Sequence, residues 1–217
     1  MVDLYSFYED VLQAEGFYQE LKRNSELSDD LKLSKENILV KANDIRLDMP
    51  LLYGDSGADK KVLILGLEPR HTDDVFNIFR KENRVYGTPF GVDRWFKSGN
   101  KGIYASAFKP FLSDSRLFLF SDFVKEYKVL DPTNKSINDS IARESFQANF
   151  EEKYRPILEK EIDIFSPDII IALGKTDVSR KIPAPWLNNY GIRVIHHPVS
   201  GNFKRMQDGM KLILQND

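Results

Sequence analysis

The stretch Lys60-Lys-Val-Leu-Ile-Leu-Gly-Leu-Glu-Pro-Arg-His71 decides the fold that we expect for this chain. Its apolar run Val-Leu-Ile-Leu has the length and composition of a buried β-strand. Gly66 permits a tight turn directly after this strand, and Pro69 restricts the backbone of the loop that follows. The loop carries an acid, Glu68, and an imidazole, His71. Loops at the carboxyl ends of strands are where α/β proteins usually present their chemistry.

Three further segments are predicted to be strands, namely Gly102–Ala107, Ser166–Gly174 and Arg193–His196. The second contains an apolar run without alternation, which a strand covered on both faces requires. Apolar periodicity and helix breakers predict helices over about 3–22, 29–41, 73–81, 140–165, 175–181 and 203–214, and loops over about 49–59, 83–96 and 182–187.

Strands separated by helical segments make right-handed parallel crossovers the default connections. We therefore predict an α/β fold, specifically a three-layer α/β/α sandwich with a central four-stranded parallel sheet. Residues 1–217 would form a single domain, with residues 1–59 as an N-terminal helical cover and residues 60–217 as the core.

Loops that follow parallel strands meet at one edge of the sheet. The three histidines of the chain, His71, His196 and His197, all fall in or beside such predicted loops. Zinc explains them poorly, because adjacent histidines rarely both bind one ion and no partner residues stand at a suitable spacing. The chain also has no cysteine. We expect neither a metal nor another cofactor.

The chain has a net charge of -2, but its positive charges gather in two segments. Between Arg70 and Lys109 there are eight Lys/Arg against four Asp/Glu, and between Arg193 and Lys211 there are four against one. A positive face on an otherwise acidic chain suits a polyanionic ligand. The alternative is that charges on solvated loops vary by chance.

Aromatic residues and arginines alternate in the predicted loop at 83–96, which contains Tyr86, Phe90 and Trp95. Such a loop can stack a base and contact phosphate. It can equally form a small hydrophobic cluster of its own. Since neither a secretory signal nor an apolar run of membrane-spanning length is evident, we expect a cytoplasmic monomer without a membrane partner.

Three motifs in this order resemble the uracil-DNA glycosylase superfamily: Gly66-Leu-Glu-Pro69, Pro167-Asp-Ile-Ile-Ile-Ala-Leu-Gly174 and His197-Pro-Val-Ser200. Members of that family have a Gly-x-(acid or Asn)-Pro loop after the first core strand and a His-Pro-Ser loop after the last. The similarity spans Lys61 to Lys211. It implies a DNA partner and hydrolysis of the N-glycosidic bond of a flipped uracil or other modified base.

The resemblance assigns catalytic roles to three residues. Base release passes through an oxocarbenium-like sugar while negative charge builds on the departing base. Glu68 matches the family's acid, which orients water and opposes the positive charge. His197 matches the histidine that stabilises the leaving base electrostatically. His71 would support them, as a histidine does in one branch of the family.

The resemblance also implies binding residues. Those near the base would be Gly66, Leu67, Pro69, Phe90 and Ser106. Those that bind the DNA would be Arg70, Pro198, Ser200, Asn202, Phe203, Lys204 and Arg205. Asn202 and Phe203 fall where the family inserts residues into the DNA, and Lys204 and Arg205 would meet phosphates.

Three positions depart from the family pattern. Ser106 aligns with an asparagine that reads uracil, and Val199 aligns with the serine of the His-Pro-Ser loop. Arg70 stands where a small or aromatic residue is usual. A catalytically inactive nucleic-acid- or nucleotide-binding protein on the same fold is therefore the alternative. An unrelated α/β hydrolase or nucleotide enzyme is less favoured, since the chain lacks both a Gly-x-Ser-x-Gly elbow and a phosphate-binding Gly-x-x-x-x-Gly-Lys loop.

Overall fold

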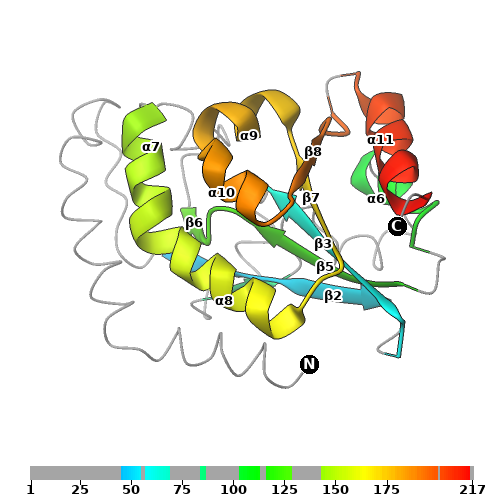
Figure 1. Cartoon of the computed structure of the whole chain (residues 1–217), viewed down its shortest axis with the longest axis horizontal. Coiled ribbons are helices and arrows are strands. Elements are labelled where there is room, and N and C mark those ends of the chain that lie inside the picture. Colours follow the sequence, from blue (N-terminus) through cyan, green and yellow to red (C-terminus); the bar gives the residue numbers. More distant parts are fainter. Residues whose placement is uncertain are drawn as a thin grey trace.

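The computed structural model describes residues 45–54, 57–68, 84–86, 103–112, 116–128, 143–199 and 201–215. Its main sheet consists, in spatial order, of β2 (Leu51–Gly54), β5 (Arg116–Asp122), β3 (Lys60–Gly66), β7 (Ile169–Leu173) and β8 (Arg193–Ile195) (Figure 1). Helices accompany this mixed five-stranded sheet, so the chain has an α/β fold.

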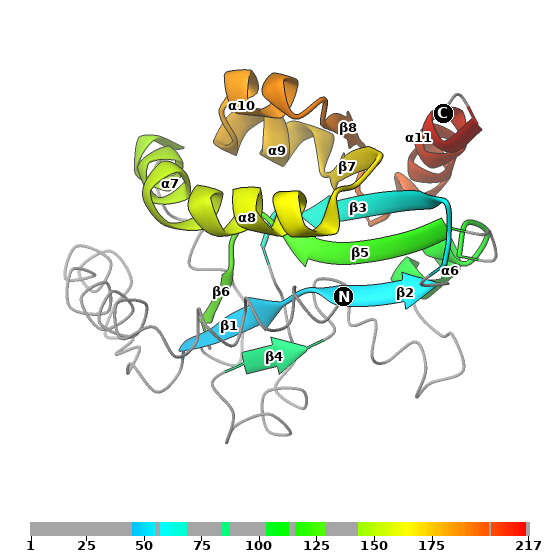
Figure 2. The same cartoon turned by 60° about the horizontal axis from the view of Figure 1, so that its bottom comes forward.

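β3 is the centre of the sheet, as the opening stretch of the sequence predicts. It runs parallel to β5 on one side and to β7 on the other, and β8 is parallel to β7. β2 adds an antiparallel strand at the edge, beside β5 (Figure 2). The four parallel strands therefore belong to a larger, mixed sheet than the sequence predicts.

The predicted second strand, Gly102–Ala107, is wrong. Residues Ile103–Phe108 form helix α6, and the strand that pairs with β3 is β5. Two of the six residues of α6 are alanines, which favour helix, and its buried Ala107 and Phe108 pack against the sheet. β5 has the continuous apolar sequence Leu-Phe-Leu-Phe that a strand with two buried faces requires.

Residues 49–53, predicted to be a loop, contribute to two strands, so the predicted helical cover at 1–59 is wrong for residues 45–54. β1 (Ile45–Met49) and β2 follow one another with only Pro50 between them. β1 belongs to a second sheet, where it pairs with β4 (Arg84–Tyr86) and β6 (Glu126–Lys128). Because proline has no N–H to donate to a ladder, Pro50 marks the point where the extended chain passes from one sheet to the other.

Helices pack against both faces of the main sheet (Figure 1). One face is covered by α7 (Arg143–Asn149), η3 (Phe150–Tyr154), α8 (Arg155–Phe165), α9 (Lys175–Lys181) and α10 (Ala184–Asn189). The other face is covered by α6 and α11 (Phe203–Gln215). Each face has its own cluster of buried side chains, which we call the α8-side core and the α11-side core.

The predicted helices at 140–165, 175–181 and 203–214 are confirmed by α7 to α8, α9 and α11. Those at 3–22, 29–41 and 73–81 lie outside the described residues. Within the segment from α7 to α8, the wider π-helical turn η3 precedes Pro156, which lies in the first turn of α8. Proline lacks an amide hydrogen and crowds the preceding turn, so a widened turn accommodates it. None of the described helices is long and apolar enough to cross a bilayer.

The predicted loop at 182–187 is also wrong, because part of it forms α10. Pro183 precedes this helix and Pro185 lies in its first turn. The first turn of a helix tolerates proline, since its N–H groups have no partner within the helix. Two prolines therefore mark a helix start here.

Candidate functional site

The order of the strands identifies one position on the sheet edge as the expected place for a ligand. β3 and β7 are neighbours, but the chain leaves them in opposite directions. From β3 it continues through β4 and the helix α6 to β5, and from β7 through the helices α9 and α10 to β8. These helices also lie on opposite faces. Such a reversal opens a crevice at the carboxyl ends of the strands, where α/β proteins bind ligands.

Glu68 lies at this edge, two residues beyond the end of β3. Its side chain is buried, with 9% exposed. The backbone that leads to it is held on the side of β5: Phe123 N–H donates to the Gly66 carbonyl (2.9 Å), and Val124 N–H donates to the Leu67 carbonyl (3.1 Å). Glu68 is therefore an acid in a sheltered and fixed position rather than on a freely solvated loop.

Asp122 is a second acid at this edge, and the sequence analysis missed it. It is the last residue of β5, fully buried, and it pairs in register with Gly66. Phe118 and Phe120 belong to the α11-side core, so the alternation of a strand places Asp122 on the same face. The sequence signal for this residue is an aspartate that ends the apolar run of β5.

His196 and His197 follow β8, which is parallel to β3 and ends at the same edge. Both side chains are half-buried, and Pro198 after them is buried. One strand, β7, separates β3 from β8, so the ends of β3 and β8 lie about 10 Å apart. Glu68 and His197 therefore come to the same edge from distant parts of the sequence.

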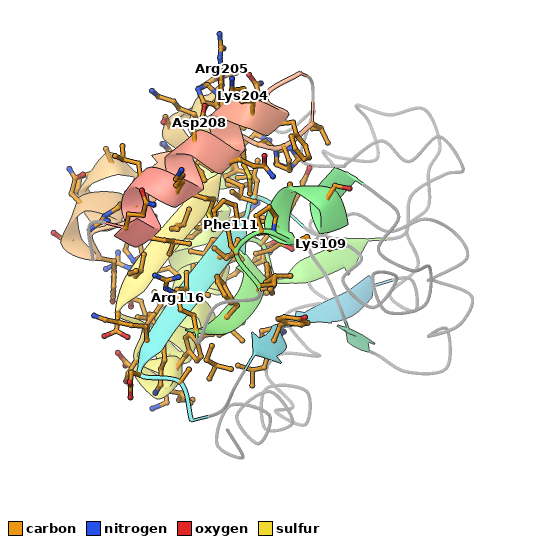
Figure 3. All side chains as sticks on the ribbon, turned by 90° about the vertical axis from the view of Figure 1, so that its right-hand side faces the viewer. Lys109, Phe111, Arg116, Lys204, Arg205 and Asp208 are labelled. Carbon is orange, nitrogen blue, oxygen red and sulfur yellow. The ribbon has the colours of Figure 1, made fainter. Side chains whose placement is uncertain are left out.

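The start of α11 brings two cations near this edge. The Asn202 carbonyl accepts the first helical hydrogen bond, from Met206 N–H (2.8 Å). Phe203 packs partly against the α11-side core, whereas Lys204 and Arg205 are exposed. Figure 3 shows these two side chains at the end of α11 opposite Arg116.

Ser106 is not at the end of a strand, where the sequence prediction placed it. It is exposed on α6, and its backbone carbonyl lies 3.4 Å from Gln207 Nε2, which also donates to the Ala107 carbonyl at 3.2 Å. Ser106 thus takes part in the contact between α6 and α11 through its backbone. Five other predicted residues lie outside the described ranges: Pro69, Arg70, His71, Phe90 and Ser200.

A buried polar group lies behind Asp122, on the opposite face of β5. Lys125 Nζ contacts Glu161 Oε2 at 2.6 Å and donates a second hydrogen bond to Ser121 Oγ. The side chains of Lys125 and Glu161 are both fully buried. Their immediate neighbours Phe123, Val124 and Ile162 belong to the α8-side core.

Within the described ranges, no three or more His, Asp or Glu side chains come together in a way that could hold a metal ion.

A scan against protein-family models finds no match for this chain, and a search of curated proteins finds none either. The resemblance to the uracil-DNA glycosylase superfamily accordingly stays a prediction from the sequence motifs.

Proposed function

We propose that this protein is a DNA base-excision glycosylase that hydrolyses the N-glycosidic bond of a flipped uracil or other modified base. The observation that carries the proposal is the presence of Glu68 and His197 on one edge of the sheet, on either side of the reversal in strand order. In the sequence these residues are more than a hundred positions apart. We also propose a three-layer sandwich that acts as a cytoplasmic monomer.

The proposed chemistry divides the developing charges between the two residues. As the bond to the base breaks, positive charge grows on the sugar and negative charge on the base. The Glu68 carboxylate opposes the first charge and orients the attacking water. An imidazole N–H of His197 donates to the departing base and stabilises the second charge. Because Glu68 is buried, its attraction to the positive charge on the sugar is stronger than it would be in bulk water.

Asp122 replaces Ser106 as the proposed base-reading residue. The resemblance assigns that role to the end of the second core strand, and β5 is that strand in this fold. An ionised carboxylate accepts hydrogen bonds but donates none, whereas an asparagine amide does both. Asp122 therefore favours a base that presents N–H donors to it.

For the DNA backbone, we propose the exposed cations Lys204 and Arg205, together with Lys175 at the start of α9. All three follow strands that end at the same edge. Cations in these positions would meet phosphates and hold the duplex while the base is extruded. The net charge of -2 makes a local group of cations more important than the charge of the whole chain.

The test is release of a free base from oligonucleotides that each carry one modified base, in single-stranded and double-stranded form. We expect release from at least one substrate, and a rate lower by about 100-fold or more in Glu68→Gln. The exposed acid Glu152 on η3 gives a matched control, Glu152→Gln, which should react like the unchanged protein. No release from any substrate would refute the catalytic proposal.

The alternative, a binding protein without catalysis, is favoured by one observation: the second core strand ends in Asp122 rather than in asparagine. This alternative predicts salt-dependent binding of an oligonucleotide or nucleotide without base release. This alternative is tested by titrating a labelled oligonucleotide at several salt concentrations. A protein that does not bind nucleic acid would show no binding even at low salt.

A further inference from the structure

We propose that the buried Lys125–Glu161 ion pair is a positioning clip, which holds Asp122 and the loop of Glu68 in place from the opposite face of the sheet. The inference deepens the proposed function and rests on it for the catalytic effect. The structural effect can be measured independently.

Stability is a poor explanation for this ion pair. Both side chains are fully buried and have left water completely. Removing two charges from water costs so much that apolar replacements of similar volume are often neutral or stabilising. Phe123, Val124 and Ile162, which adjoin the pair in the sequence, belong to the α8-side core, an apolar setting that favours such replacements. A role in fixing one local conformation explains the pair better.

The conformation to be fixed is a bulge at the end of β5. Leu47 pairs with Glu126 and Leu51 pairs with Phe120, so the three residues 48–50 on one side oppose the five residues 121–125 on the other. The extra residues bend the chain away from regular pairing. Lys125 closes this bulge, because its ammonium group reaches back to the Ser121 hydroxyl, four residues earlier, while Glu161 anchors it to α8.

The enclosed residues are the ones that determine the geometry of the candidate site. Asp122 lies within the bulge. The next two amides, of Phe123 and Val124, donate to the carbonyls of Gly66 and Leu67. These carbonyls begin the loop of Glu68. A shift of the bulge would therefore move both acids.

The clip acts without touching a substrate at the proposed site. Leu117 and Leu119 belong to the α8-side core, so alternation along β5 puts Ser121 on that face and Asp122 on the other. Lys125 and Glu161 are thus positioning residues. Their effect on catalysis should appear in the rate of base release rather than in the affinity for DNA.

The test replaces both partners together, as Lys125→Met/Glu161→Leu. We expect this variant to fold with an unchanged or higher urea midpoint, and amide exchange at Phe123 and Val124 to become faster by about ten-fold or more as the bulge opens more often. Base release should slow by about 100-fold, the effect of displacing reacting groups by about 1 Å, with unchanged DNA affinity. Lys125→Met alone should destabilise the protein, because it leaves a buried charge unpaired.

The exposed ion pair of Arg155 and Glu151 on the same helical segment supplies a control, since its side chains are 40% and 39% exposed. Glu151→Gln should change neither exchange nor base release. Unchanged exchange at Phe123 and Val124, unchanged base release or loss of the fold in the double variant would each overturn the clip. Faster exchange in a protein whose unchanged form releases no base would support the clip and refute the glycosylase.

Discussion

At the scale of single residues, Gly54 shows how closely the end of β2 approaches β5. Its backbone has a φ of 120°, which side chains rarely allow, and a Cβ atom built there would lie 2.2 Å from the Arg116 carbonyl oxygen. That oxygen belongs to the backbone of the sheet and cannot move away alone. Gly191 also has a positive φ, of 61°, but has no heavy atom within 4 Å of such a Cβ. A side chain at Gly191 would cause backbone strain alone, whereas a side chain at Gly54 would cause both strain and a steric clash.

We predict that Gly54→Ala lowers the free energy of unfolding by about 3 kcal/mol or more, because left-handed strain of about 1–3 kcal/mol adds to the clash. Gly191→Ala should cost only about 1–2 kcal/mol. Urea unfolding of both variants measures the difference. An equal loss of unfolding free energy in the two variants would contradict the close approach of Gly54 to Arg116.

Asp122 offers a second test at this scale. If it reads the base, Asp122→Asn should shift the preference toward bases such as uracil, which present an N–H donor beside a carbonyl acceptor. The measurement compares base release across the substrate panel for the two proteins. If both proteins rank the substrates in the same order of release rate, Asp122 does not read the base.

At the scale of elements, α11 is fixed at its end by a side chain from β5. Arg116 Nη2 donates to the Leu214 carbonyl at 2.8 Å. The last carbonyls of a helix have no partner within the helix, and a cation is favourable there. We predict that Arg116→Met lowers the free energy of unfolding by about 1–2 kcal/mol, measured in urea. The exposed Lys211 on the same helix is the control, and Lys211→Met should have little effect.

The contact of α8 with α10 makes stability depend on pH. Burial opposes ionisation of Glu159, but hydrogen bonds from Arg155 (2.8 Å) and Trp186 (2.9 Å) prevail and hold its pKa below the ordinary 4.5. A lowered pKa means that Glu159 stabilises the fold above its unfolded pKa and loses this effect as pH falls through the folded value. Burial, and then the charge of Glu159, raise the pKa of Tyr190 above 10.0.

We therefore predict that between about pH 5 and pH 3 the free energy of unfolding falls less steeply in Glu159→Gln than in the unchanged protein. For Tyr190, the raised pKa has the opposite consequence: its contribution is complete below the unfolded pKa and is lost as pH rises through the folded value. Urea unfolding from about pH 5 to about pH 3, and at alkaline pH as Tyr190 ionises, tests the direction of each change in stability. Parallel curves for Glu159→Gln and the unchanged protein would contradict the first.

The elements also show what the sequence can predict. The continuous apolar runs of β3 and β7 and the helical period of α11 identify these elements directly. β5 was missed because two short apolar segments competed for the second strand, and only packing selected Leu117–Phe120 over Gly102–Ala107. This one exchange also replaced Ser106 by Asp122 in the candidate site. Glu68 and His197 could be proposed from the sequence because each lies two residues beyond a recognisable strand, β3 or β8.

At the scale of the whole molecule, the position of the positive charges matters more for DNA binding than the net charge. The chain has 31 Lys/Arg and 33 Asp/Glu, so its total charge does not attract DNA. Lys204 and Arg205 stand exposed at the candidate edge. Because each neutralised phosphate adds about 0.9 to the dependence of log affinity on log salt, replacing both by glutamine should reduce this slope by about 2. Lys160→Gln on α8 is the control, and an equal effect there would contradict a localised DNA-binding face.

The decisive measurement compares the rates of base release of the unchanged protein, Glu68→Gln and Glu152→Gln under single-turnover conditions. We predict measurable release in the unchanged protein and in Glu152→Gln, and a rate about 100-fold or more lower in Glu68→Gln. A rate in Glu68→Gln equal to that of the unchanged protein would contradict this prediction.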